Sequence, residues 1–293
     1  MNEAGRLREL LRRDGMLTAP GAYDCITAKL IEKAGFAAVY MTGAGTAATL
    51  GYPDFGLVTM SEMVANARRI AAAVTVPVIA DADTGYGNEL NVVRTVREYE
   101  QSGVAGIHIE DQGFPKKCGH LDDKEIVARE DWLAKIRAAA AARKNADFLI
   151  IARTDARAVA GFDEAIARAN AALAAGAEMV FVEAPQTLEE VAEVPRLVNG
   201  PCLLNVVYGG KTPEVGLDEA ERMGYKLAIL PGLLTKSVVG VCEQALGELQ
   251  RLRRHPPPVR EMTVREMFQR FGADEWDALR RRFRTAPMAD AAK

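Results

Sequence analysis

Acidic side chains stand at the ends of several short apolar segments of this chain. Asp81 and Asp83 close one segment, and Glu110 and Asp111 close the next. Clustered carboxylates repel one another unless a cation lies among them or some are protonated. If Asp81 and Asp83 share a strand, their spacing of two directs both side chains to one side. Because these ligands are oxygen atoms and no His/Cys set accompanies them, the pattern predicts Mg²⁺, with Mn²⁺ possible, rather than zinc.

Helix capping is the competing explanation for such acids. Asp24 and Asp155 are explained equally well by capping, by a salt bridge or by catalysis. For Asp83 and Glu110 together, a metal site is the better explanation.

A polar segment, residues 114–126, contains two lysines, a thiol and an imidazole within five positions. This composition is typical of a mobile lid over a site. We expect Lys116 and Lys117 to lower the pKa of Cys118 and make its thiol a better proton donor. The alternative is a small loop residue beside a solvated basic patch.

Arg153 ends an otherwise apolar segment, where its charge is costly to bury unless it meets an anion. A metal and an arginine together predict a dianionic substrate. Thr42, Gly43 and Ala44 could add a hydroxyl and backbone N–H groups to the same carboxylate, although they also fit a simple tight turn.

These residues must be positioned by the apolar segments, of which we count eight, alternating with longer Ala-rich segments of helical spacing. That alternation predicts parallel strands with crossover helices, closed into a (β/α)₈ TIM-type barrel whose active-site residues lie at the carboxyl ends of the strands. No G-x-G-x-x-G follows the first segment, so dinucleotide binding is not expected. The predicted strands lie in residues 16–24, 37–43, 76–83, 106–112, 148–155, 179–185, 202–208 and 226–232.

The end of the chain differs in character, so we expect a barrel catalytic domain over 1–249 and a helical extension over 250–293. An eight-stranded barrel has no obvious place to bury the apolar residues of this extension, and docking on a neighbouring subunit is expected, although folding back on its own barrel is the alternative. The residues concerned are Met262, Phe268, Phe271, Trp276, Leu279 and Phe283.

Composition excludes several classes of protein. The 37 basic and 40 acidic residues leave a net charge of −3, so neither nucleic acid nor an anionic membrane is an expected partner. No apolar run approaches the roughly 20 residues of a membrane helix, and the first residues lack a signal-peptide core, so a cytoplasmic location is expected. The four cysteines form no C-x-x-C pair, which argues against a disulfide framework.

The sequence resembles a known family, the isocitrate lyase/phosphoenolpyruvate mutase superfamily. Within it, the chain looks like the branch of 2-methylisocitrate lyase, 2,3-dimethylmalate lyase, oxaloacetate hydrolase and carboxyphosphonoenolpyruvate phosphonomutase. The resemblance covers about residues 16–250 and is carried by TGAGTAA (42–48), DADTGYG (81–87), HIEDQ (108–112), KKCGH (116–120) and IARTDA (151–156).

The resemblance implies roles for individual residues, with Cys118 as the general acid. It also implies a homotetramer in which C-terminal helices are exchanged between subunits. The implied metal ligands are Asp81, Asp83, Asp54 and Glu110, with His108 beside them. The implied substrate contacts are Tyr40, Thr42, Gly43, Ala44, Gly119, Arg153, Glu183 and Asn205. The implied catalytic residues are Cys118, Glu110, Arg153, Lys116 and His120.

The expected activity is a Mg²⁺-dependent carbon–carbon lyase that splits a 2-hydroxy-di- or tricarboxylate into a 2-keto acid such as pyruvate and a second carboxylate. Members of mutase and decarboxylase type can lack the cysteine, so Cys118 favours lyase chemistry. Residues 205–213 resemble the dimethylmalate lyase, hydrolase and phosphonomutase members, and residues 231–236 depart from the methylisocitrate lyases, which disfavours a tricarboxylate. The alternatives are a phosphorus–carbon bond-forming mutase, an oxaloacetate hydrolase or decarboxylase, and a non-catalytic metal-binding barrel.

Overall fold

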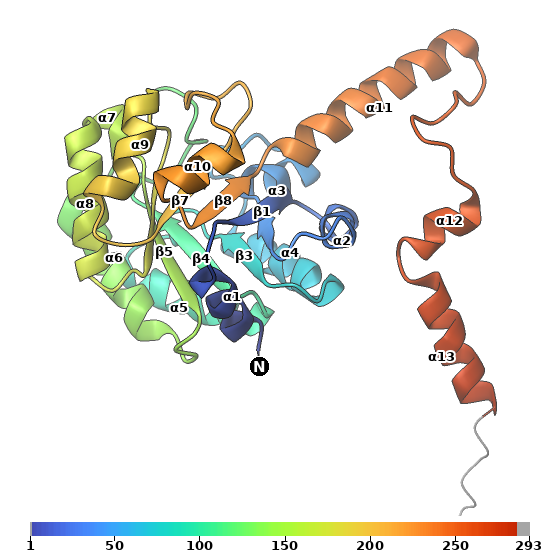
Figure 1. Cartoon of the computed structure of the whole chain (residues 1–293), viewed down its shortest axis with the longest axis horizontal. Helices are drawn as coiled ribbons and strands as arrows, with labels where there is room; N and C mark the ends of the chain where they lie inside the picture. Colours follow the sequence, from blue (N-terminus) through green and yellow to red (C-terminus); the bar gives the residue numbers. More distant parts are fainter. Residues whose placement is uncertain (1, 286–293) are drawn as a thin grey trace, which may run out of the picture. The chain divides into compact units, whose positions relative to one another are not determined.

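The computed structural model describes residues 2–285, and its strands form a closed barrel of eight parallel strands in chain order (Figure 1). β1 pairs with both β2 and β8, which closes the sheet. The predicted (β/α)₈ barrel is confirmed, and each predicted segment contains one strand. The strands are β1 (Leu17–Ala22), β2 (Val39–Met41), β3 (Val78–Asp81), β4 (Gly106–Glu110), β5 (Leu149–Thr154), β6 (Met179–Val182), β7 (Cys202–Asn205) and β8 (Leu227–Leu230).

Helices surround the strands, and local sequence fixes many of their ends. Asn88 caps the start of α5 with a capping box, and Gly103 ends that helix at φ +92°, a conformation that glycine adopts without strain. The helices of the barrel are α1 (Glu3–Arg12), α2 (Cys25–Lys33), α3 (Gly43–Thr49), α4 (Met60–Ala73), α5 (Glu89–Ser102), α6 (Arg129–Ala142), α7 (Ala156–Val159), α8 (Phe162–Ala174), α9 (Leu188–Leu197) and α10 (Leu217–Met223).

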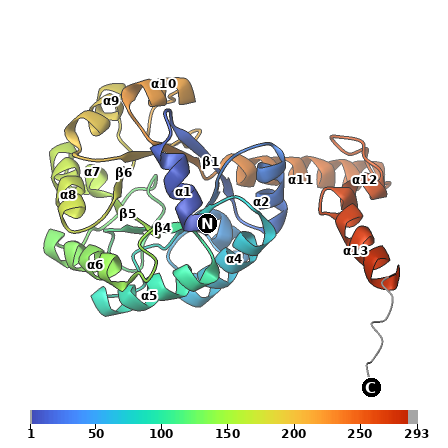
Figure 2. The same ribbon diagram turned by 60° about the horizontal axis from the view of Figure 1, so that its bottom comes forward.

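Two apolar cores result. One lies between the strands and the surrounding helices, and the other fills the barrel interior, where Ile79, Ile151 and Leu227 pack together. Leu7 of α1 belongs to the interior core and is fully buried. Figure 2 shows α1 lying across the ring of strands and helices. The opposite end of the barrel, where the strands have their carboxyl ends, is left for the site.

The chain divides into two compact units, residues 1–238 and 239–293. The second unit contains most of α11 (Leu233–Leu252), α12 (Val264–Gln269) and α13 (Ala273–Thr285). Its apolar side chains are largely exposed in a single chain, with Trp276 at 71% and Phe283 at 72%. Within residues 2–285, no helix is both long and apolar enough to cross a membrane.

Candidate active site

A cavity of about 380 Å³ lies at the carboxyl ends of the strands. It contains side chains from both predicted classes, the acids of the metal site and the thiol of the 114–126 loop. Asp81 lies at its buried end, and Gly209 and Lys236 are exposed. The predicted site residues that line this cavity are Tyr40, Thr42, Ala44, Asp54, Asp81, Cys118, Gly119, His120, Arg153, Glu183 and Asn205.

Asp81 and Asp83 lie together at the rim, but not as alternate residues of one strand. β3 ends at Asp81, and Asp83 follows it with φ +45°. The expectation that strand geometry aligns the pair is therefore wrong. A turn brings them together instead, in which the Asp83 N–H donates to Asp81 Oδ1 at 2.9 Å.

Lys116 of the loop contacts the same acids. Its Nζ lies 2.5 Å from Asp54 Oδ1 and 2.8 Å from Asp83 Oδ1, and the lysine is buried. Burial and the neighbouring Asp81 and Asp54 outweigh this lysine and raise the pKa of Asp83 to about 6. Asp83 is thus still mostly ionised at neutral pH, and a further cation nearby would favour its charged form.

Glu110 gives the clearest sign that a cation fits this rim. Both of its carboxylate oxygens are buried and accept no hydrogen bond, although Oε2 lies 3.1 Å from Arg153 Nη1. Burial raises the pKa of Glu110 well above its ordinary value despite Arg153 and Lys116. Within residues 2–285, no three His, Cys, Asp or Glu side chains are arranged to hold a metal directly. Since Mg²⁺ retains several waters and needs only one or two carboxylates, the rim fits an ion held partly through water.

Asp81 is supported from below by buried polar groups of the barrel interior. Its Oδ2 accepts from the Gly43 N–H at 3.2 Å and from Tyr40 OH at 3.4 Å. Tyr40 OH also lies 2.8 Å from His108 Nε2. Burial lowers the pKa of His108 to about 4, so its imidazole is neutral near pH 7 and orients its neighbours without adding charge.

The predicted carboxylate-binding turn is the start of a helix. Thr42 caps α3 by accepting from the Gly45 N–H, and Gly43 N–H is directed at Asp81. A Cβ on Gly43 would lie 2.4 Å from Asp81 Oδ2, so a larger residue would displace that carboxylate. Thr42 and Ala44 line the cavity, whereas Gly43 supports the acid.

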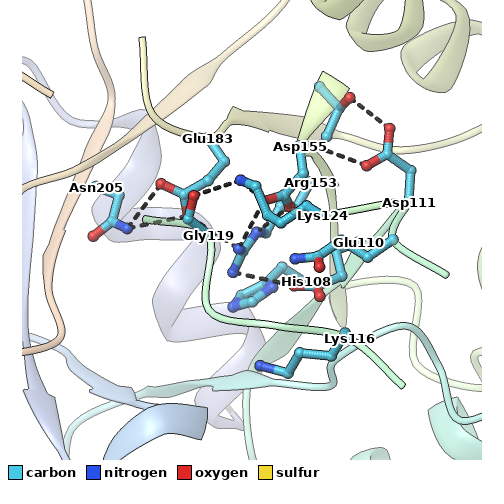
Figure 3. A network of polar contacts seen from close by, with 12 residues as sticks. His108, Glu110, Asp111, Lys116, Gly119, Lys124, Arg153, Asp155, Glu183 and Asn205 are labelled. Atoms are coloured by element: carbon cyan, nitrogen blue, oxygen red, sulfur yellow. Dashed lines mark hydrogen bonds and ion pairs between the residues drawn. The ribbon is translucent and has the colours of Figure 1, made fainter. Parts of the chain in front are cut away.

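Arg153 lies at the centre of a buried charge network (Figure 3). Its guanidinium contacts Asp155 Oδ2 at 3.0 Å, Glu110 Oε2 at 3.1 Å and Glu183 Oε2 at 3.2 Å, and it lies 5.0 Å from the centre of the Phe181 ring. The anion that its burial requires is therefore supplied by the protein itself. The inference that burial of Arg153 demands a substrate carboxylate is corrected accordingly, although the arginine still lines the cavity.

Cys118 lines the same cavity, and its N–H donates to the Asp54 carbonyl at 3.0 Å. The expectation of a lowered thiol pKa is wrong. Burial, together with Asp54 and Glu183, raises the pKa of Cys118, and the ammonium of Lys116 is directed at Asp54 and Asp83 instead. The thiol therefore stays protonated at neutral pH, which is the form a proton donor requires.

The loop after β4 is joined to the loop after β7 through His120. Its Nε2 lies 3.2 Å from Glu183 Oε1, and its Nδ1 accepts from the Lys211 N–H at 3.0 Å. The Asn205 amide donates to Glu183 at 3.2 Å. Gly119 leaves no room for a side chain, because a Cβ there would lie 2.5 Å from Arg153 Nη2.

Lys124 was not identified from the sequence, although it belongs to the polar 114–126 segment. Its buried Nζ lies 2.7 Å from Asp155 Oδ1 and also donates to the Gly119 carbonyl, which fixes the loop to the end of β5. Asp155 is thus a structural ion-pair partner, and Asp24 caps α2. The presence of three lysines in a loop next to an acidic rim could have indicated that one of them pairs with a rim carboxylate.

Comparisons with known proteins agree with this geometry. A family model described as phosphoenolpyruvate phosphomutase matches residues 7–250. A 2,3-dimethylmalate lyase of Eubacterium barkeri is 53% identical over 79% of this chain and 80% of its own length. A 2-methylisocitrate lyase of Aeropyrum pernix is 46% identical over 83% of this chain and 78% of its own length.

Solved structures resemble the whole chain. A 2,3-dimethylmalate lyase superimposes with a TM-score of 0.92 at 39% identity, covering 100% of this chain and 99% of that one. An oxaloacetate acetylhydrolase bound to 3,3-difluorooxalacetate gives 0.91 at 37% identity, with 98% of each chain covered. A phosphonopyruvate hydrolase complex with oxalate and Mg²⁺ gives 0.86 at 30% identity, covering 97% of this chain and all of that one.

Proposed function

Since the chain belongs to the phosphoenolpyruvate mutase/isocitrate lyase superfamily, we propose that it is a divalent-metal-dependent lyase that cleaves the C2–C3 bond of a small 2-hydroxy-dicarboxylate. The products are a 2-keto acid such as pyruvate and a second carboxylate. The observation that carries this proposal is the single cavity that contains both the Asp81 carboxylate and the Cys118 thiol.

The acidic rim is the proposed metal end of the cavity, with Asp81, Asp83, Asp54 and Glu110 binding Mg²⁺ or Mn²⁺ directly or through water. When bound, the ion supplies a Lewis acid that holds the 2-hydroxy acid unit of the substrate and lowers the pKa of its hydroxyl. Tyr40 and Gly43 N–H hold the Asp81 carboxylate in place for this purpose. A relative solved with Mg²⁺ and oxalate supports the assignment.

The thiol of Cys118 is the proposed general acid. As the 2-hydroxyl gives up its proton to solvent and its oxygen becomes the keto group, the C2–C3 bond breaks. This leaves the electron pair on C3 of the second fragment, and that carbon must receive a proton. The raised pKa keeps the proton on sulfur until this step. His120, Gly119 and Lys116 position the loop that carries the thiol, while Arg153, Glu183 and Asn205 form the facing wall.

The substrate that the relatives favour is a 2,3-dimethylmalate-like compound, with a 2-methylisocitrate-like tricarboxylate less favoured. Hydrolysis of oxaloacetate is a second candidate, because an oxaloacetate acetylhydrolase superimposes on nearly the whole chain. Both reactions break a carbon–carbon bond beside a hydroxyl or hydrated carbonyl and leave a carbanion to protonate.

An assay of pyruvate and oxalate release tests the proposal. The purified enzyme would be incubated with Mg²⁺ and, separately, 2,3-dimethylmalate, 2-methylisocitrate and oxaloacetate. Pyruvate from a 2-hydroxy acid is the expected result, and oxalate from oxaloacetate alone would favour the second candidate. Phosphonopyruvate would be incubated in parallel, and its conversion without cleavage of any of the other three compounds would contradict both.

We also propose that residues 1–249 are the catalytic barrel and that 250–293 make subunit contacts in a homotetramer, with C-terminal helices exchanged between subunits. The many exposed large apolar side chains of α11, α12 and α13 support this, since burying them against another subunit would remove them from water. A cytoplasmic location remains a prediction.

A further inference from the structure

The turn that carries Asp81 and Asp83, residues 81–86, has an unusual backbone. Asp83 has φ +45° and Tyr86 has φ +61°, a region that side chains other than glycine rarely adopt. Such backbone persists only where the surrounding structure fixes it. The contacts that fix this turn therefore also decide where its two carboxylates lie.

The barrel sheet fixes only one side of the first peptide of the turn. The Ala82 N–H donates to the His108 carbonyl of β4 at 3.2 Å. Because the N–H and C=O of a trans peptide point in opposite directions, the Asp81 carbonyl points away from β4. On that side β2 has already ended at Met41, opposite Ala80. A group outside the sheet must therefore supply the donor.

Tyr99 of α5 supplies this donor. Its hydroxyl donates to the Asp81 carbonyl at 2.8 Å, and its side chain is fully buried. Burial raises the pKa of the phenol well above its ordinary value, so the hydroxyl keeps its proton at neutral pH. With the peptide between Asp81 and Ala82 bonded on both sides, its plane is fixed.

Tyr86 lies on the turn itself and completes the arrangement. The phenol oxygens of Tyr86 and Tyr99 are 3.0 Å apart. Because the single hydroxyl hydrogen of Tyr99 is used on the Asp81 carbonyl, Tyr86 must be the donor to Tyr99. Hydrogen bonds in a chain polarise one another, so this donation strengthens the bond to Asp81.

Other carbonyls of the turn are fixed further from Asp81. The Thr84 carbonyl accepts from Lys135 Nζ at 3.1 Å, and the Gly85 carbonyl accepts from Thr95 Oγ1 at 3.1 Å. Tyr99 differs from these two residues because it bonds to the acidic residue itself. It also differs from Lys135 in being uncharged, so removing its hydroxyl leaves the charge around the acidic rim unchanged.

We propose that Tyr99 is a positioning residue for the divalent ion. By holding the Asp81 carbonyl, with Tyr86 orienting its hydroxyl, it keeps the Asp81 and Asp83 carboxylates in the geometry that binds the ion. This inference rests on the proposed function, because it takes these acids as metal ligands. Groups that orient metal ligands typically contribute about ten- to a hundredfold to the affinity for the ion.

Calorimetric titration of the intact chain with MnCl₂ alone tests the proposal without requiring turnover. Tyr99→Phe keeps the ring and removes only the hydroxyl, and it should weaken Mn²⁺ binding by about tenfold. Tyr86→Phe leaves the bond from Tyr99 to Asp81 in place, so a smaller loss of affinity is expected. Thermal unfolding of each variant verifies folding.

Tyr225→Phe is the matched control. Tyr225 is also buried and donates to a backbone carbonyl at 2.8 Å, but that carbonyl belongs to Val191 of α9. Loss of one buried hydrogen bond should lower the midpoint of thermal unfolding in Tyr225→Phe about as much as in Tyr99→Phe, while the Mn²⁺ affinity stays that of the wild type.

Three results overturn the assignment. They are an unchanged Mn²⁺ affinity in Tyr99→Phe, an equal loss of affinity in Tyr99→Phe and Tyr225→Phe, and a larger loss in Tyr86→Phe than in Tyr99→Phe. The second result would mean that any loss of stability weakens metal binding. The third would mean that Tyr86 acts on the metal by a route other than Tyr99.

The pyruvate assay separates the two possible failures. If Tyr99→Phe loses Mn²⁺ affinity but no 2-hydroxy-dicarboxylate is cleaved, the proposed reaction is wrong and the assignment of Tyr99 stands. If cleavage occurs and Tyr99→Phe binds Mn²⁺ as the wild type does, the assignment is wrong and the proposed reaction stands. A wild-type protein that binds no Mn²⁺ contradicts both the metal site and the assignment of Tyr99.

Discussion

Gly119→Ala adds one methyl group at the point where the 114–126 loop meets the opposite wall of the cavity. The new Cβ would lie 2.5 Å from Arg153 Nη2 and 2.5 Å from Glu183 Cγ. An ordinary contact is about 3.4 Å or more, so the loop or the wall must shift by roughly 1 Å. Arg153 cannot yield easily, because three carboxylates hold it.

We therefore expect the loop, and with it the Cys118 thiol, to move. A misplacement of about 1 Å costs on the order of a hundredfold in rate. The expected result is a fall in kcat of that size in steady-state kinetics, with little change in the midpoint of thermal unfolding.

Gly113→Ala, at the residue directly before this loop, is the matched control. A Cβ there meets only Glu125, at 3.8 Å, so activity should be close to wild type. Full activity of Gly119→Ala would mean that the loop does not pack against Arg153 and Glu183 during turnover, which would contradict this prediction.

Three further predictions concern the metal, the loop and the tail. Asp83→Ala should abolish Mg²⁺-dependent turnover while the circular dichroism spectrum stays that of a folded barrel, and an Asp83→Ala enzyme active in excess chelator would rule out this ligand. Lys124→Met should accelerate amide exchange of residues 114–126 by roughly thirtyfold. It removes a buried ion pair with Asp155 at a cost of about 2 kcal/mol, because Arg153 still pairs with that carboxylate. Lys117→Met changes only a solvent-exposed hydrogen bond and should not accelerate exchange. A chain ending at Leu249 should sediment as a smaller species than the full chain, which we expect to be a tetramer, and a full chain that is monomeric at micromolar concentration would exclude subunit contacts by the tail.

The strands were predictable because local sequence determines them. Each is a short apolar run bounded by glycine, proline or polar residues, and a parallel barrel brings their carboxyl ends to one face. This is why Asp81 and Arg153 were recognised from their places in the sequence. They meet Glu183 and Asn205, which the family resemblance implied, in one cavity. The predicted strands were too long at their ends, which led to the wrong geometry for Asp83.

Contacts between distant segments could not be predicted. Lys116 meets Asp54 and Asp83, and Lys124 meets Asp155, only after the loop folds over the rim. The pKa of Cys118 was misjudged for the same reason. Lys116 is close in sequence but its ammonium contacts Asp54 and Asp83, and burial has the largest effect on the pKa of the thiol. Pairing across space, rather than neighbours in sequence, decides which charge a thiol experiences.

The most direct test of the account is to follow cleavage of 2,3-dimethylmalate in D₂O by the wild-type enzyme and by Cys118→Ser. The account predicts pyruvate and the second carboxylate in equal amounts. The second carboxylate should carry one deuterium, on the carbon that was C3 of the substrate. It predicts that Cys118→Ser binds the substrate nearly as the wild type does but turns it over at least about a hundredfold more slowly, since a hydroxyl is a far weaker acid than a thiol. A Cys118→Ser enzyme with wild-type turnover and labelling would contradict the assignment of this thiol as the proton donor.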